Sequence, residues 1–281
     1  MGQRYNRIGR ETLQIADTAP MELLRQIVEW QEDETDDQRD LDWPASEDED
    51  AFRRSVKSLL DEQTIEFLRP IEDRCVRINQ LASANGIKSL SHVAKERLSH
   101  EQYQEFDAQP NELCRCIWMF LGRQQDFRDA EAFHAVRQYR DHGRMYDAFE
   151  ADAGAATITS VQQMDPGTLA GLLTTRLDLP SKVDISTLHL QATPTHRPSL
   201  LVIVRHAGPL SSVFHHKDGG QRKTIYFRPS NEASLVWTPD EGLIEACGAS
   251  PQVRMSVAET FAEVVFKTDL SKKPLSWRYY D

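Results

Sequence analysis

Three imidazoles and one carboxylate in the second half of the chain could together hold a divalent metal ion. His206, His215, His216 and Asp218 lie within thirteen residues, and imidazole nitrogen with carboxylate oxygen is a ligand set of zinc and manganese sites. Adjacent strand residues point to opposite faces, so His215 and His216 cannot both serve one ion without a bulge. We therefore expect no bound metal, with His206, His215 and Asp218 as the candidate ligands if one is held.

The segment Leu200–Pro209, LLVIVRHAGP, places an Arg-His pair at the end of an apolar run. It resembles the strand and Arg-His motif of the histidine phosphatase family, which implies that His206 would accept a phosphoryl group. In that family a second arginine and a distant second histidine complete the phosphate pocket. Only 75 residues follow His206 here, and the later histidines are its near neighbours. The pair is therefore expected to mark the point where a strand emerges into solvent.

Arg137 and His142 are separated by four residues near the end of a helical pattern. This spacing is similar to the Arg-x4-His motif of HEPN ribonucleases, whose arginine and histidine act on RNA phosphodiesters at a groove between dimerised helices. The residue after the arginine is Gln138, where that family usually has Asn, Asp or His. An arginine and a histidine in a last helical turn also interact favourably with the helix dipole. A HEPN-like ribonuclease is the alternative function.

Basic and aromatic residues alternate in residues 221–229, QRKTIYFRP. A tyrosine there could stack on a base while its basic neighbours contact phosphates. The candidate nucleic-acid-binding residues are Arg222, Lys223, Tyr226 and Arg228. Residues 151–281 hold 13 acidic and 13 basic residues, which is a poor electrostatic footprint for nucleic acid. Strand alternation favours a core position for Ile225 and Phe227, with the charges at solvated edges.

The net charge of −11 is concentrated in the first half of the chain, where residues 1–150 hold 31 acidic and 20 basic residues. The window 29–50 has twelve carboxylates and a single basic residue, Arg39. Such a density repels itself and cannot be buried, so the sequence predicts a disordered acidic loop over residues 31–47. A solubilising loop, a docking strip for a basic partner and a mimic of nucleic-acid charge all remain open.

Helical periodicity dominates residues 1–150, which predicts an acidic all-helical domain. Apolar residues recur at helical spacing over residues 19–30, 70–84, 111–124 and 129–143. Asn85-Gly86 is expected to end the second of these helices in a left-handed cap, and Asn111 to cap the third. Residues 151–165 are small and weakly patterned, which indicates a linker.

Residues 166–281 change from helical to strand periodicity after one helix that starts at Pro166 behind an Asp165 cap. Runs rich in β-branched and aromatic residues cover 186–193, 199–206, 222–229, 233–239 and 242–248. Their short connections predict an antiparallel sheet of about five strands. A closing helix from Pro251 is expected to cover that sheet, with Phe261 and its helical neighbours Val253, Val257 and Val265 against Ile225, Phe227, Leu235 and Trp237. The fold class is α+β overall.

Functional signatures are sparse in this sequence. It has no apolar run of membrane-spanning length, no signal-type start, no Gly-rich phosphate loop and no nucleophile with placed partners. Four cysteines indicate neither a disulfide framework nor a zinc site. We therefore expect a cytoplasmic bacterial protein without a cofactor. Its expected role is that of a non-enzymatic interaction or regulatory subunit that binds a larger protein partner, with nucleic acid as a further candidate partner.

The acidic window generates the first prediction. The amides of Glu32–Glu47 should exchange with deuterium at the rate of an unfolded peptide, because self-repelling carboxylates cannot offset the entropy of ordering. Hydrogen exchange on the isolated protein measures this, and uniform protection across the window would contradict it.

Overall fold

The computed structural model describes residues 8–31, 41–45, 48–142, 147–151, 158, 161, 165–216, 222–248 and 250–279. Most of the acidic loop expected at 31–47 and most of the linker expected at 151–165 lie outside these residues. The chain divides into two compact units, residues 1–135 and 136–281. The division falls after Ala135, before the expected boundary at residue 150. The strand β1 (Asp147–Glu150), which precedes that boundary, pairs with a strand of the second unit.

The first unit is helical, as its periodicity predicts. Its helices are α1 (Arg10–Thr18), α2 (Met21–Glu29), α3 (Glu49–Asp61), α4 (Ile65–Ala82), α5 (Gly86–Arg97), α6 (His100–Asp107) and α7 (Glu112–Gly122), and α8 (Gln124–His142) continues into the second unit. The side chains of Asp48, Thr64, Ser99 and Asn111 each accept a backbone N–H of the following first turn, which satisfies donors that a helix start leaves open. The expected cap at Asn111 is confirmed.

Asn85 and Gly86 do not form the expected left-handed cap. Asn85 has right-handed helical torsions, with φ −94°, and Gly86 begins α5. A Cβ at Gly86 would lie 2.3 Å from the carbonyl oxygen of Gln80. Glycine is therefore needed here because the turn between α4 and α5 brings backbone against backbone, and a positive φ is not involved.

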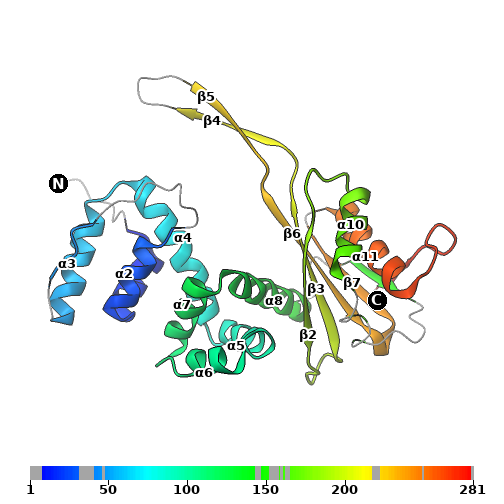
Figure 1. Ribbon diagram of the computed structural model, residues 1–281, viewed down its shortest axis with the longest axis horizontal. Coiled ribbons are helices and arrows are strands. Elements are labelled where there is room, and N and C mark those ends of the chain that lie inside the picture. The colour runs from blue at the N-terminus through cyan, green and yellow to red at the C-terminus, as the bar shows by residue number, and fades with distance from the viewer. Residues whose placement is uncertain are drawn as a thin grey trace. The chain divides into compact units, whose positions relative to one another are not determined.

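The second unit contains a six-stranded antiparallel sheet in the order β2-β3-β6-β7-β1-β8. Besides β1, its strands are β2 (Asp184–Leu190), β3 (Ser199–Ala207), β6 (Ser230–Thr238), β7 (Leu243–Cys247) and β8 (Ser276–Trp277). A separate two-stranded sheet is formed by β4 (Ser211–His216) and β5 (Arg222–Phe227), which extends away from the larger sheet (Figure 1). The α+β class, the antiparallel sheet and the C-terminal helix are confirmed.

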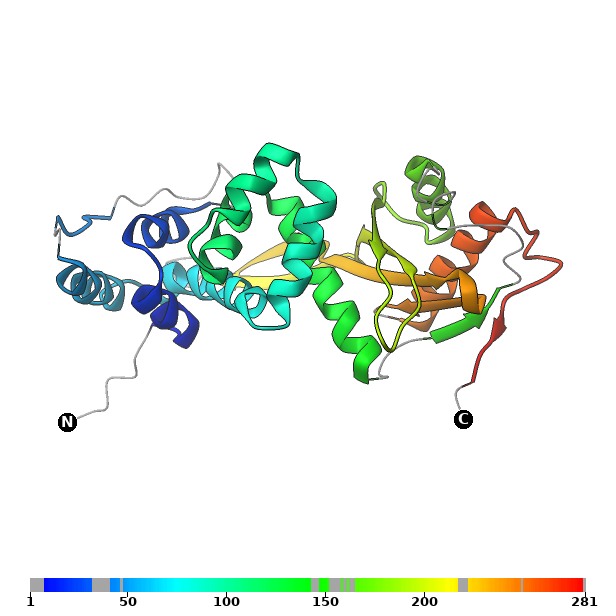
Figure 2. The ribbon, with the colours of Figure 1, turned by 90° about the horizontal axis from the view of Figure 1, so that it is seen from below.

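Two helices, α10 (Pro166–Arg176) and α11 (Pro251–Phe266), lie side by side against one face of the six-stranded sheet (Figure 2). Asp165 and Ser250 cap them, each ahead of a proline at the helix start, as expected. Phe261 is fully buried and its ring centroid lies 6.1 Å from that of Trp237. The buried core between helices and sheet also contains Leu169, Leu173, Leu200, Val202, Val204, Leu235, Ile244 and Val257.

The expected placement of Ile225 and Phe227 in this core is wrong. Both belong to β5 in the two-stranded sheet, where they are 40% and 42% exposed. Val257, Phe261, Leu235 and Trp237 do meet as expected. The alternation along β5 is real, but it does not specify which sheet the strand joins.

Two further local features of the second unit are the turn between β6 and β7 and an ion pair between α11 and β1. Gly242 takes a left-handed conformation, φ 57°, after the short 3-10 helix η1 (Pro239–Glu241), and its N–H donates to the Pro239 carbonyl at 3.1 Å. Arg254 of α11 pairs with Asp147 of β1 and donates to the Gly248 carbonyl at 3.0 Å. Within the described ranges, no helix combines the length and apolar character needed to cross a membrane.

The packing of α11 generates a stability prediction. Phe261→Ala should lower the free energy of unfolding of the second unit by about 3–5 kcal/mol, because it opens a cavity beside Trp237. Gln252→Ala, at an exposed position of the same helix, should cost under about 0.5 kcal/mol. Urea-dependent hydrogen exchange of β6 amides in the full chain reports this unit, and equal stabilities for the two variants would show that Phe261 does not hold the helix on the sheet.

Candidate functional site

Residues 208–229, here called the arm, continue the β3–β6 pairing beyond the six-stranded sheet as the β4–β5 hairpin (Figure 1). Ala207 pairs with Ser230 and Ser211 pairs with Phe227, so three residues of one strand oppose two of the other. This is a β-bulge, which bends a hairpin and increases its twist. The bulge therefore separates the arm from the sheet that supports it.

The junction at the base of the arm is tightly built. The Gly208 N–H donates to the Pro229 carbonyl at 2.6 Å, and Arg228 Nη1 donates to the Gly208 carbonyl at 3.1 Å. A Cβ at Gly208 would lie 2.8 Å from Cγ of Pro229. Only glycine fits this approach, so the junction fixes where the arm starts.

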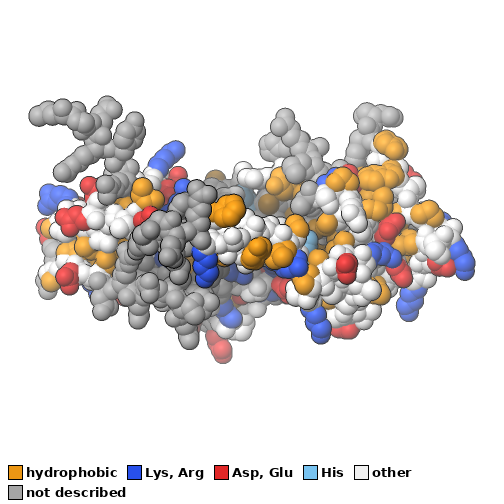
Figure 3. Space-filling view, turned by 90° about the horizontal axis from the view of Figure 1, so that it is seen from above, with side chains coloured by type: hydrophobic (Ala, Val, Ile, Leu, Met, Phe, Trp, Pro, Cys, Tyr) orange, Lys and Arg blue, Asp and Glu red, His pale blue; other side chains and the backbone are white. Residues whose placement is uncertain are grey.

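Both faces of the arm expose apolar side chains. Among the described residues, twelve large hydrophobic side chains are exposed, and six of them, half of the set, lie between positions 210 and 227. The register places Val213 opposite Ile225 and Ser211 opposite Phe227, so these three apolar residues share one face, the Val213 face. Tyr226 and Phe214, 68% and 75% exposed, share the other, the Tyr226 face. The space-filling view also has hydrophobic side chains open to view among polar and charged ones (Figure 3).

The arm is basic although the chain is acidic. Residues 208–229 contain four basic residues and a single acid, Asp218, which gives a net charge of +3. Of the nucleic-acid candidates, Lys223 and Tyr226 are exposed on β5, and Arg228 is also exposed while its Nη1 donates to the Gly208 carbonyl. The backbone of Arg222 lies in β5, and its side chain is outside the described residues.

Arg205 and His206 lie at the end of β3. Arg205 donates to Glu232 at 3.0 Å and lies 3.8 Å from Asp184, its cross-strand neighbours on β6 and β2. His206 is 8% exposed, and its Nδ1 lies 3.0 Å from the carbonyl oxygen of Ala207. Its Nε2 has no hydrogen-bond partner in the part of the chain that the structure describes. The expected emergence into solvent is therefore incomplete, because the imidazole stays buried.

The candidate metal ligands are separated by the strand topology. His206 lies on β3, which pairs with β2 and β6, whereas His215 lies on β4, which pairs with β5. An extended strand advances about 3.3 Å per residue, so the eight residues between them separate the two imidazoles by more than one ion can span. Among described residues no group of three or more His, Cys, Asp or Glu could hold a metal, and Asp218 and the His215 side chain lie outside that description.

Arg137 and His142 lie on the last turns of α8, as their helical pattern predicts. Arg137 is half-buried and interacts with neighbouring residues. The His142 side chain lies outside the described residues. A shared groove for the two side chains therefore stays a prediction.

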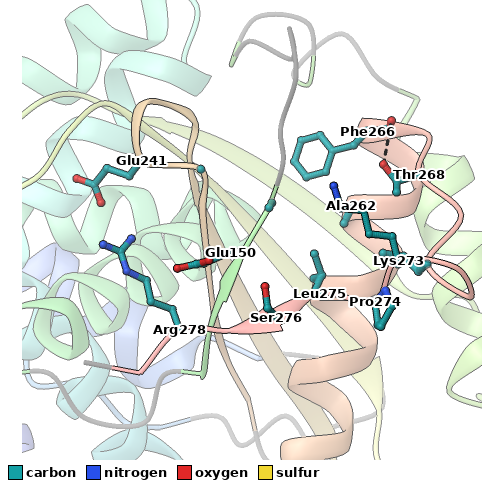
Figure 4. Close-up of a pocket in the computed structure, with 13 residues that line it drawn as sticks. Glu150, Glu241, Ala262, Phe266, Thr268, Lys273, Pro274, Leu275, Ser276 and Arg278 are labelled. Carbon is teal, nitrogen blue, oxygen red and sulfur yellow. Dashed lines mark hydrogen bonds between the residues drawn. The ribbon is translucent and has the colours of Figure 1, made fainter. Parts of the chain in front are cut away.

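A pocket of about 510 Å³ lies between the end of α11, the β6–β7 turn and the segment around β8 (Figure 4). Its charged lining residues are Glu150, Glu241, Lys273 and Arg278. Lys273 and Arg278 both interact with neighbouring residues, and neither histidine nor cysteine is among the described residues that line the pocket. We therefore assign no chemistry to this pocket.

The five predicted strands do not include β4, although His215 and His216 are expected to be strand residues, and Val213 and Phe214 are not singled out. The signal that could have found them is the turn Lys217-Asp218-Gly219-Gly220, which needs a strand before it if residues 222–229 form the strand after it. A segment with Val-Phe in its centre, Ser211–His216, fills that position.

Comparisons with protein-family models, with curated protein sequences and with solved structures find no match for this chain. Any functional assignment therefore rests on the geometry of the described residues.

The cysteines generate a reactivity prediction. Burial raises the pKa of the Cys75 thiol to about 12 and raises the pKa of Cys116, Cys114 and Cys247 above the ordinary value. Thiolate is the reactive form and is scarce at neutral pH when the pKa is raised, so all four should react with a disulfide reagent more slowly than a free thiol. Cys247, the half-buried one, should react first. A fast-reacting thiol at pH 7, mapped by mass spectrometry, would contradict this and point to an activated nucleophile.

Proposed function

We propose that this chain is a non-enzymatic interaction or regulatory subunit that binds a larger protein partner through the arm. The observation that supports this is the exposure of apolar side chains on both faces of the β4–β5 hairpin. An isolated two-stranded hairpin is at best marginally stable in water, and clustered exposed apolar surface marks interaction sites. Covering both faces would remove this surface from water and stabilise the arm.

The chemistry of the arm indicates what its partner offers. Side chains on two opposite faces fit a groove better than a flat surface. The net charge of +3 in residues 208–229 favours carboxylates at the rim of that groove, since complementary charge speeds association and selects partners. The tight Gly208–Pro229 junction holds the base of the arm in place before binding, which lowers the entropy lost on association.

Single-stranded nucleic acid is a second candidate partner, favoured by one observation. Phe214 and Tyr226 are diagonal neighbours on the Tyr226 face, whereas the exposed Lys223 pairs with His215 and so belongs to the Val213 face. Two exposed aromatic rings on one face can stack bases. The Val213 face would stay uncovered in such a complex, so the protein partner is favoured.

The proposal predicts that the double variant Phe214→Ser, Tyr226→Ser loses its bound protein while its stability stays within about 0.5 kcal/mol of the parent, since both side chains are exposed. Affinity capture from the source cells with quantitative mass spectrometry measures this. Ile65→Ser, which removes an equally exposed apolar side chain from α4, is the matched control and should retain the partner.

Three outcomes separate the alternatives. An unchanged set of captured proteins in the double variant would contradict the proposal. Binding of a labelled oligothymidylate that weakens with salt and disappears in the double variant would favour nucleic acid. Cleavage of RNA that is lost in Arg137→Ala would favour the HEPN-like alternative.

A further inference from the structure

We propose that the outer edge of β4 pairs with the same edge of a second copy of this chain, joining two arms into one four-stranded antiparallel sheet. This inference rests on the proposed function only in its premise that the arm is uncovered in the single chain. It concerns the backbone edge of β4, whereas the proposed partner protein covers the side chains on the faces.

The arm has an open edge along β4. This strand pairs with β5, and no further strand joins their sheet within the described parts of the chain. The outer side of β4 therefore presents backbone N–H and C=O groups that a further strand can bind. Proteins usually protect such edges with charged residues or proline on the edge strand, or by making the strand very short. The six-stranded sheet does this at β8, which has two residues.

The residues of β4 lack that protection. Ser211–His216, SSVFHH, contains no Lys, Arg, Asp, Glu or Pro. By contrast, β5 begins with Arg222 and Lys223 and is followed by Arg228. Two β5 edges brought together would carry four cations, Arg222 and Lys223 from each copy, and charged residues on an edge strand disfavour edge-to-edge pairing. Of the two edges of the arm, only the β4 edge therefore lacks charged residues that would oppose pairing with the same edge of a second copy.

A second copy is the occupant that fits this edge. When β4 pairs antiparallel with β4 of a second copy, the two copies are related by a twofold axis. The same edge is then used by both copies, and no separate partner is required. In a register centred on Val213 the two Val213 side chains are direct neighbours, and Ser212 faces Phe214 of the second copy. No charged pair is created in that register at neutral pH. The joined arms also present twice the apolar face area to a third protein.

Such an interface is small, so the dimer should be weak, with a dissociation constant on the order of 1–100 µM. Sedimentation of the full-length chain from about 1 to about 300 µM, a range that brackets this value, should show conversion from one to two copies. The central variant is Val213→Lys, which places two ammonium groups against each other across the axis. It should raise the dissociation constant by at least about tenfold.

Ile225→Lys is the matched control. Ile225 is directly opposite Val213 on the same face and similarly exposed, 40% against 49%. Either substitution therefore removes the same cross-strand contact within the arm and adds the same charge, but only position 213 lies on the proposed edge strand. Ile225→Lys should dimerise within about threefold of the parent, and Val213→Thr, which stays uncharged and β-branched, should do so as well.

Several results would overturn the inference. A parent chain that is still monomeric at the highest concentration has no such pairing. If Val213→Lys and Ile225→Lys weaken the dimer equally, the contact lies on the apolar face of the arm. If Ile225→Lys weakens the dimer more, the contact lies on β5. A monomeric parent whose partner capture still depends on Phe214 and Tyr226 would leave the proposed function standing while this inference fails.

Discussion

The pairing of β3 with β6 is the interaction on which the second unit depends. The two strands pair from Leu200–Trp237 to Ala207–Ser230. Their inward side chains Val202, Leu235 and Trp237 belong to the same buried core as residues of the two covering helices. The same pairing continues through the bulge at Gly208 and Pro229 into the arm. A core that fixes these two strands therefore also fixes the base of the arm. The surface that we propose for binding is thereby an extension of the most buried part of the unit.

Local sequence signals predicted much of the fold because they act over a few residues. Asp165 with Pro166 and Ser250 with Pro251 begin helices where expected, and Asn111 caps α7. Strand periodicity correctly located the residues that became β2, β3, β5, β6 and β7. These signals depend on single backbone donors and on side-chain direction, which neighbouring residues largely determine.

Longer-range features were not predictable in the same way. Ile225 and Phe227 fit the pattern of core residues because alternation shows only that a strand has an apolar face. Their exposure follows from the extra residue in 208–210, which starts a new hairpin, and from the pairing of β5 with β4 alone. The pair Asn85-Gly86 fits the pattern of a left-handed cap, but the glycine is explained by the close approach of its Cα to the Gln80 carbonyl. Both errors arise where the tertiary fold decides between two local conformations or pairings.

The described residues that could do chemistry are largely engaged in structure, and this directs attention to the arm. Arg205 is held between Glu232 and Asp184, and Cys75 and Cys116 are buried with raised pKa values. The arm differs from these sites because its side chains face solvent on both sides. Both proposals therefore depend on one physical claim, that the arm is uncovered in a single chain and becomes covered on assembly.

Hydrogen exchange of the β4 amides as a function of protein concentration tests that claim most directly. In a single chain only the amides bonded to β5 should be protected, while those on the outer edge exchange quickly. We predict fast exchange for the outward amides at nanomolar concentration, and slow exchange for the same amides near the top of the micromolar range. Full protection of all β4 amides at nanomolar concentration would show that the single chain already covers the arm, and would contradict the claim.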